Sequence, residues 1–169
     1  MIIANIIGGL GNQMFQYATA RAISLELGTS LRLDISGYDK YKLHQGFELQ
    51  RIFNNTIEIA SELDRRIVLG WQSTTFSRKL LLRQRMAWLR SKSFVIEPHV
   101  QYWQGLAEIP NDCYLMGYWQ SEKYFSLAEA RIRADFSFKL PLQNKNAEVA
   151  RKILQANSVS LHVRRGDYA

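Results

Sequence analysis

The first 35 residues constrain the fold of this chain more than any other part of its sequence. The apolar run Ile2 to Ile7 meets Gly8-Gly9-Leu10-Gly11, which predicts a buried strand entering a tight loop. Residues 12–27 place apolar side chains at helical spacing, and Gly28 stands where helices often end. Residues 31–35 alternate apolar and polar side chains, as a strand does. Together they predict a βαβ unit, and therefore an α/β fold with parallel strands and a right-handed crossover.

The rest of the chain continues this alternation of helices and strands. Residues 36–53 are polar and aromatic with little periodicity, which predicts a long loop. Ser126 and Glu129 have the spacing of a capping box, which predicts a helix start. The further helices are predicted at 61–69, 77–91, 126–135 and 146–155, the last with Val149, Ile153 and Leu154 buried, and the further strands at 94–97, 113–118 and 159–163.

The charge of the chain favours anionic partners, because 22 basic and 15 acidic residues give a formal net charge of +7. The single cysteine, Cys113, cannot form an internal disulfide; we expect it to be buried in a protein of a reducing compartment. No stretch approaches the roughly 20 apolar residues of a membrane span, so we expect a soluble, cytoplasmic protein. The basic residues from Arg78 to Lys92 leave two interpretations open, a solvated amphipathic helix and a contact with an anionic membrane.

The last predicted strand runs into His162-Val163-Arg164-Arg165-Gly166-Asp167. The carboxyl ends of strands are where α/β folds bind ligands. An arginine there offers a planar fork of donors that matches two phosphate oxygens. Asp167 is expected to hold an arginine or cap a helix, and His162 to support the site by hydrogen bonding. On residue types alone, a phosphate site and a solvated strand end remain equally open.

The first glycine loop is a second candidate site. Gly9 and Gly11 let the backbone approach a ligand closely, and the amides at the start of the following helix favour an anion. Asn12 and Gln13 are placed to hydrogen-bond a sugar or phosphate. The alternative is a tight strand-to-helix turn in which Asn12 acts only as the N-cap.

Aromatic residues follow the predicted strand at 113–118. Tyr118, Trp119 and Tyr124 are of the kind that stacks on a sugar ring, but aromatic side chains beside a strand are more often part of a core. Both interpretations are carried forward.

Three segments give the chain a family resemblance. The pattern His-x-Arg-Arg-x-Asp at 162–167 resembles the donor-binding motif of the α-1,2-fucosyltransferases, and more loosely that of α-1,6- and protein O-fucosyltransferases. Two further segments resemble the bacterial α-1,2 group, Gly8-Gly9-Leu10-Gly11-Asn12-Gln13-Met14-Phe15-Gln16-Tyr17-Ala18 and Gly117-Tyr118-Trp119-Gln120-Ser121-Glu122-Lys123-Tyr124-Phe125. The segments occur in the expected order and span nearly the whole chain.

The resemblance implies an inverting glycosyltransferase of the GT-B type, with two Rossmann-like domains facing across a cleft. It implies transfer of fucose from GDP-fucose to the 2-hydroxyl of a galactose unit in a glycan acceptor, without a metal or other cofactor. The acceptor is expected mainly on the N-terminal domain and GDP-fucose mainly on the C-terminal one.

The resemblance also implies roles for residues of this chain. Arg164 is expected to contact the β-phosphate of the leaving GDP, where a fixed cation stabilises the charge that grows as the glycosidic bond breaks. Arg164 and Asn12 are the expected catalytic residues. The expected nucleotide-sugar contacts are His162, Arg164, Arg165, Asp167, Gly9 and Gly11. No acid is selected as general base, although Asp34, Asp39 and Glu48 fall in predicted loops or strand ends.

The predicted domain organisation is an N-terminal, acceptor-side domain at 1–156 and the first strand and loop of a donor domain at 157–169. We therefore expect the chain alone to have little or no transferase activity. The terminal strand is expected to self-associate with another chain, since it has no sheet of its own. The expected location is the bacterial cytoplasm, at or near the inner membrane.

Two other functions remain open at this stage. Gly9-Leu10-Gly11 with Asp34 at the end of the second strand is compatible with a dinucleotide-binding oxidoreductase, although Met14 occupies the third glycine position of that fingerprint. A non-catalytic module that binds glycan is the other. We expect no nucleic-acid partner, because no nucleic-acid motif accompanies the positive charge.

Overall fold

The computed structural model describes residues 1–40 and 45–161. In this part of the chain four parallel strands form one sheet in the order β2-β1-β4-β3. The strands are β1 (Ile2–Asn5), β2 (Leu31–Asp34), β3 (Phe94–Ile96) and β4 (Cys113–Met116). The α/β class and the parallel sheet predicted from the sequence are confirmed, and the arrangement is that of a Rossmann-like domain.

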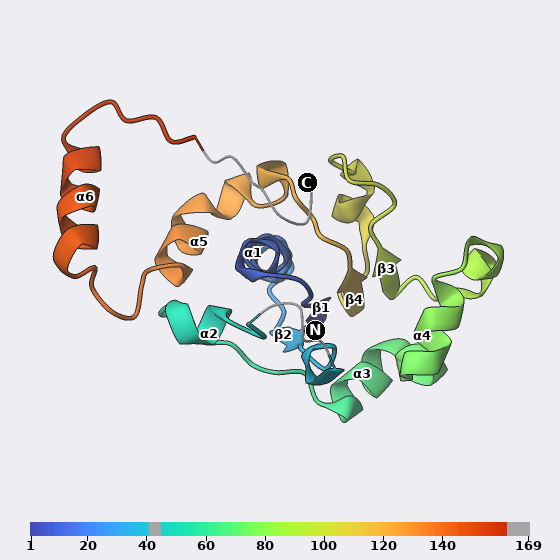
Figure 1. Cartoon of the computed structure of the whole chain (residues 1–169). Helices are drawn as coiled ribbons and strands as arrows, with labels where there is room; N and C mark the ends of the chain where they lie inside the picture. Colours follow the sequence, from blue (N-terminus) through green and yellow to red (C-terminus); the bar gives the residue numbers. More distant parts are fainter. Residues whose placement is uncertain (41–44, 162–169) are drawn as a thin grey trace. The chain divides into compact units, whose positions relative to one another are not determined.

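Helices and short 3-10 turns connect the strands (Figure 1). The α-helices are α1 (Leu10–Glu26), α2 (Leu49–Ile52), α3 (Glu62–Leu69), α4 (Thr75–Leu81), α5 (Glu129–Asp135) and α6 (Asn144–Leu154). The 3-10 turns are η1 (Tyr38–Lys40), η2 (Gly70–Ser73), η3 (Gln84–Leu89), η4 (Gln104–Glu108), η5 (Glu122–Tyr124) and η6 (Ser126–Ala128). Gly28, with φ +59, follows the end of α1 as predicted.

Both faces of the sheet are buried, each in a core of its own. Successive side chains of a strand point to opposite faces, so each strand contributes to both cores. In β1, Ile2 and Ala4 join the core under α1 and α2, whereas Ile3 joins a second core under α3 and α4. In β4, Leu115 points to the first core and Tyr114 to the second. Helices on both faces explain why these strands are continuously apolar. Figure 1 shows α1 on one side of the sheet and α3 on the other.

The register of the sheet brings its carboxyl ends to one edge. Ala4 of β1 lies beside Leu33 of β2 and Leu115 of β4, and Ile96 of β3 lies beside Met116. The loops that follow the four strands therefore leave the sheet at the same edge, where α/β folds bind their ligands.

The single helix predicted over 77–91 is wrong, because the segment is divided into α4 and η3. Arg83 between them has extended backbone, with ψ 130. The Arg90 side chain folds back and donates from Nε to the carbonyl of Leu81 at 2.6 Å and from a terminal nitrogen to that of Leu82 at 3.4 Å. These carbonyls at the end of α4 would otherwise accept from a continuing helix.

The predicted capping box at Ser126 and Glu129 is also wrong. Ser126 begins the η6 turn, α5 starts without a side-chain cap, and Glu129 pairs with Arg133 at 2.7 Å instead. A capping box occurs at α3, where Ser61 and Asp64 exchange hydrogen bonds between side chain and backbone.

The chain divides into two compact units, residues 1–137 and 138–169. The domain boundary expected near residue 156 stays a prediction. In the second unit the predicted burial of the α6 side chains is wrong, because Val149, Ile153 and Leu154 are 45%, 52% and 86% exposed. Residues 159–161 form no strand and are exposed, since within the described part of this unit no strand is available to pair with them.

Candidate functional site at the carboxyl edge of the sheet

The glycine loop after β1 is shaped by Gly8, which has φ +79 and is followed by Gly9 at the N-cap of α1. A side chain at Gly8 would be strained, and its Cβ would lie 2.5 Å from Nδ2 of Asn12. Asn12 lies inside the first turn of α1, so the interpretation of Asn12 as the N-cap is wrong. Its side chain is half-buried at the surface of this loop.

Two glutamines of α1 hold the loops of this edge together. The buried Gln13 side chain donates to the carbonyls of Gly8 at 3.1 Å and Gly46 at 2.9 Å and accepts from the Glu48 amide at 2.9 Å. Gln16 accepts from the Ile7 amide and donates to the Gly117 carbonyl, each at 3.0 Å. Gln13 is 0% exposed, so the expectation that it contacts a ligand is wrong; it supports the loop instead.

The loop after β4 is held by Glu97, which follows β3. The Glu97 carboxylate accepts from the backbone amides of Tyr118 at 2.7 Å and Trp119 at 3.0 Å. Trp119 has φ +55, a conformation that costs a residue other than glycine on the order of 1–3 kcal/mol unless its surroundings impose it. A Cβ on Gly117 would collide with the Glu97 side chain, so the close approach requires glycine. The sequence had not selected Glu97, although an acid as the last residue of a predicted strand was a usable signal.

The two described segments of the resemblance, 8–18 and 117–125, meet at this edge. Gln120 donates to Oδ1 of Asn12 at 2.7 Å, across 108 residues of sequence. The rings of Phe15 and Phe125 pack with centroids 6.0 Å apart. Of the expected site residues, Gly9, Gly11 and Asn12 are therefore brought together with the Tyr118 loop.

A cavity of about 190 Å³ lies beside the glycine loop, lined by Ile6, Ile7, Gly8, Gly37, Tyr38 and Tyr118. Tyr38 is fixed there because its hydroxyl donates to the Gly8 carbonyl at 2.7 Å. Tyr118 is 43% exposed. The cavity is smaller than the roughly 300–1,000 Å³ of most small-molecule sites, so it suits one ring of a larger ligand.

The aromatic residues of this region take different roles. Trp119 is 1% exposed and belongs to the core, which was one of the two interpretations of the aromatic residues. Tyr124 packs edge-on against Trp119 and accepts from the Trp103 amide at 2.8 Å. Tyr118 alone of the three named aromatics is placed at the cavity, while Tyr38 joins it from a loop that the sequence left unassigned.

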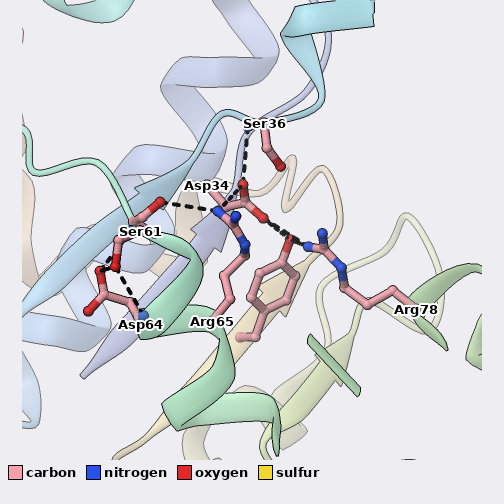
Figure 2. Close-up of polar contacts among 8 residues, drawn as sticks. Asp34, Ser36, Ser61, Asp64, Arg65 and Arg78 are labelled. Atoms are coloured by element: carbon pink, nitrogen blue, oxygen red, sulfur yellow. Dashed lines mark hydrogen bonds and ion pairs between the residues drawn. The ribbon is translucent and has the colours of Figure 1, made fainter. Parts of the chain in front are cut away.

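Asp34 is enclosed rather than open to a ligand (Figure 2). Its carboxylate is 0% exposed and accepts from Arg65 at 3.2 Å, from Arg78 at 2.8 Å and from the Tyr114 hydroxyl at 2.7 Å. Burial acts to raise the pKa of Asp34, but hydrogen bonds from Ser36, Tyr114 and Arg78 outweigh it and hold the pKa below its usual value. Burial, and then the Asp34 charge, raise the pKa of Tyr114, whose hydroxyl stays protonated. Asp34 therefore cannot hold a ribose, which removes the main support for a dinucleotide-binding oxidoreductase.

A larger cavity of about 280 Å³ lies where β2 begins, lined in part by Tyr17, Arg21, Arg131 and Asp135. Asp135 pairs with Arg21 at 3.1 Å and with Arg131 at 3.3 Å, so these charges satisfy one another. The cavity lies at the amino edge of the sheet, away from the edge where α/β folds bind ligands.

Some predicted features fall outside the residues that the structure describes. His162, Arg164, Arg165 and Asp167 are among them, and their roles stay predictions.

Within residues 1–40 and 45–161, His, Cys, Asp and Glu side chains do not gather in the groups of three that a metal site would need. Over the same ranges no helix is both long and apolar enough to cross a bilayer. Cys113 is buried, and burial raises the pKa of its thiol to about 12.

Fold and site together define an α/β domain with a cavity of about 190 Å³ at the carboxyl edge of its sheet. Comparison with known proteins adds a relative: the chain is 34% identical over 169 residues to an alpha-1,2-colitosyltransferase of Escherichia coli, a match covering 99% of the chain and 55% of that protein. The chain thus spans about half the length of the curated relative it matches. It is related to a glycosyltransferase. No family model matches the chain, and no solved structure matches it.

Proposed function

We propose that this chain provides the acceptor side of an α-1,2-glycosyltransferase that moves fucose from GDP-fucose to the 2-hydroxyl of a galactose unit. A relative named as an α-1,2-transferase supports the reaction class. The resemblance to the bacterial α-1,2-fucosyltransferases supports the choice of fucose, GDP-fucose and galactose. A colitosyl donor is the rival choice, supported by the name of the relative.

The observation that carries the proposal is the meeting of segments 8–18 and 117–125. Gln120 bonds Asn12, and Gln16 bonds Gly117, so two segments far apart in sequence form one surface. The cavity beside it is lined by Tyr118 and by Tyr38, whose hydroxyl is bonded to the Gly8 carbonyl. A tyrosine presents an apolar ring with a polar tip, which suits the apolar face and hydroxyl groups of a pyranose. We assign the galactose unit to this cavity.

In the proposed reaction the galactose 2-hydroxyl oxygen attacks the anomeric carbon of fucose. The bond from that carbon to the diphosphate oxygen breaks, GDP leaves with the electron pair, and the proton of the hydroxyl passes to solvent water. Because Gln120 donates to Oδ1 of Asn12, the Asn12 amide group keeps Nδ2 as its donor toward the reacting sugars. Arg164 stabilises the charge that develops on the diphosphate.

Acceptor binding tests the proposal on this chain. Saturation-transfer NMR with methyl β-galactoside is expected to show contacts to the ring, and Tyr118→Ala to weaken the signal strongly. Tyr102→Ala is the matched control, because Tyr102 is 40% exposed and Tyr118 43%, while Tyr102 does not line the cavity. No galactoside signal, or equal loss in both variants, would contradict the assignment.

The donor is tested separately by mass spectrometry of the galactoside. Because the chain alone is expected to have little transferase activity, the incubation with GDP-fucose or with a nucleotide-linked colitose is long and uses a high protein concentration, so that trace product is detected. A fucosyl product linked through the 2-position supports the fucosyl assignment. A product formed from the colitosyl donor alone would assign the chain to the chemistry of its relative.

A further inference from the structure

Basic residues are concentrated in one segment of the chain. Between Arg65 and Ile96 the sequence has eight basic residues and no acidic one. Arg65 and Arg78 turn inward to Asp34. Lys79, Arg83 and Arg85 remain exposed. The outward charge of this segment is therefore positive throughout.

Large apolar side chains are exposed among these cations. Phe76 and Trp88 are each 79% exposed, and Leu82 is 42% exposed. Single exposed apolar residues are ordinary, but several large ones grouped with cations mark an interaction surface. We call the six residues Phe76, Lys79, Leu82, Arg83, Arg85 and Trp88 the α4–η3 surface.

The α4–η3 surface is presented by a fixed support. Phe76 and Lys79 are three residues apart in α4 and lie on one face of that helix, and η3, which carries Arg85 and Trp88, packs against α4. Leu81 is 0% exposed and packs in the core beneath, so the side of α4 that faces the sheet is occupied. Arg90 donates to the Leu81 carbonyl at 2.6 Å. The Gln72 side chain donates to the Leu89 carbonyl and accepts from the Ser91 amide, both at 3.2 Å. These bonds hold η3, and with it Trp88, against α4 and η2.

We propose that the α4–η3 surface binds the surface of an anionic lipid bilayer. The apolar side chains of this surface would enter the boundary between headgroups and acyl chains, while its lysine and arginine side chains would extend to the lipid phosphates. A second copy of this chain would bring like charges together, which disfavours it. Nucleic acid would match the charge but leave Phe76, Leu82 and Trp88 without an apolar environment. A bilayer accommodates both components of the surface.

Vesicle sedimentation of the 169-residue chain tests this. Binding to vesicles of equal parts phosphatidylglycerol and phosphatidylcholine is expected, and binding to phosphatidylcholine alone is expected to be far weaker. Each basic residue near an anionic surface contributes about fivefold, so Arg83→Glu with Arg85→Glu should weaken binding about 25-fold or more. Phe76→Ser with Trp88→Ser should weaken it as well and remove most of the blue shift of tryptophan emission.

Arg151→Glu with Lys152→Glu is the charge-matched control, since both side chains are exposed in α6. Its effect is expected to stay within about threefold, as long-range charge is screened by salt. Circular dichroism checks that each variant folds, and the charge variant suffices if the apolar variant does not. The proposal is overturned if the chain binds both vesicle types equally or neither, or if the control loses as much as the surface variants. It is also overturned if the surface variants instead dissociate a dimer, or if they abolish binding of a DNA fragment while vesicle binding persists.

Discussion

Replacing Asp34 with asparagine should destabilise the protein severely while leaving the shape of the side chain almost unchanged. Asp34 is fully buried, and its two oxygens are shared by Arg65, Arg78 and the Tyr114 hydroxyl (Figure 2). Asparagine cannot neutralise the guanidinium groups, which remain largely buried with side-chain exposures of 16% and 11%. Removing one partner of a buried ion pair costs about 3–5 kcal/mol.

That loss is large against the total stability of a domain, about 5–15 kcal/mol. With a urea dependence of about 2 kcal/mol per molar, a loss of about 4 kcal/mol lowers the unfolding midpoint by about 2 M. Urea unfolding followed by circular dichroism measures the shift. Tyr114→Phe removes one hydrogen bond to the same carboxylate and should lower the free energy of unfolding by about 1–3 kcal/mol.

The control is Glu62→Gln, which breaks an exposed pair with Arg66 at 3.2 Å. Such surface pairs contribute about 0–1 kcal/mol, so its midpoint should hardly move. The reasoning is refuted if Asp34→Asn unfolds at nearly the same urea concentration as Glu62→Gln. That outcome would mean that Asp34 is not the charge that compensates the two arginines, and it would reopen a ligand-binding role for it.

Three further predictions concern Glu97, the dependence of stability on pH, and the effect of removing divalent cations. Glu97→Gln should weaken galactoside binding about tenfold, because glutamine can accept from only one of the backbone amides of Tyr118 and Trp119 and turns a donor toward the second. NMR titration measures the affinity, with Glu122→Gln, at an exposed position, as the control. Equal affinities of the two variants would argue against the role of Glu97. Stability should fall as pH drops below about 4, because Ser61, followed by Arg32, lowers the pKa of Asp64 to about 2, and the pKa of Asp34 is also lowered. The stabilisation from each carboxylate is fully present above its pKa in the unfolded chain and is lost as pH falls through its pKa in the folded protein. The urea midpoint is therefore expected to fall between pH 5 and pH 2.5, and a rise would contradict the prediction. Any transfer that mass spectrometry of the galactoside detects should persist in EDTA, and restoration of a lost activity by a divalent cation would instead assign a metal to the reaction.

Much of the fold was accessible to sequence reasoning because it depends on local patterns. The apolar run of β1, the helical spacing of α1 and the alternation of β2 each reflect the geometry of one element. The same reasoning failed where distant groups intervene. Arg90 falls inside the predicted helix range, yet its side chain folds back and caps a carbonyl at the end of α4, a contact that helical periodicity does not record.

The residues of the candidate site also fall into those that sequence reasoning could name and those that it could not. Gly9, Gly11, Asn12 and Tyr118 could be named from their residue types and from the family resemblance. The roles of Gln13 and Gln16 could not, because an amide at a loop surface and an amide that clamps two loops look alike in sequence. Glu97 was missed for a related reason, since its partners are backbone amides, which leave no trace in the sequence.

The sequence by itself determined the α/β class, the parallel strands, the glycine loop and the positive charge between Arg65 and Ile96, because periodicity, turn chemistry and charge are properties of neighbouring residues. The tertiary structure alone decided that Gln120 reaches Asn12 and that Asp34 is closed off by Arg65 and Arg78. These outcomes depend on which segments the sheet register brings to one edge, and on how much water the packing excludes around a charge.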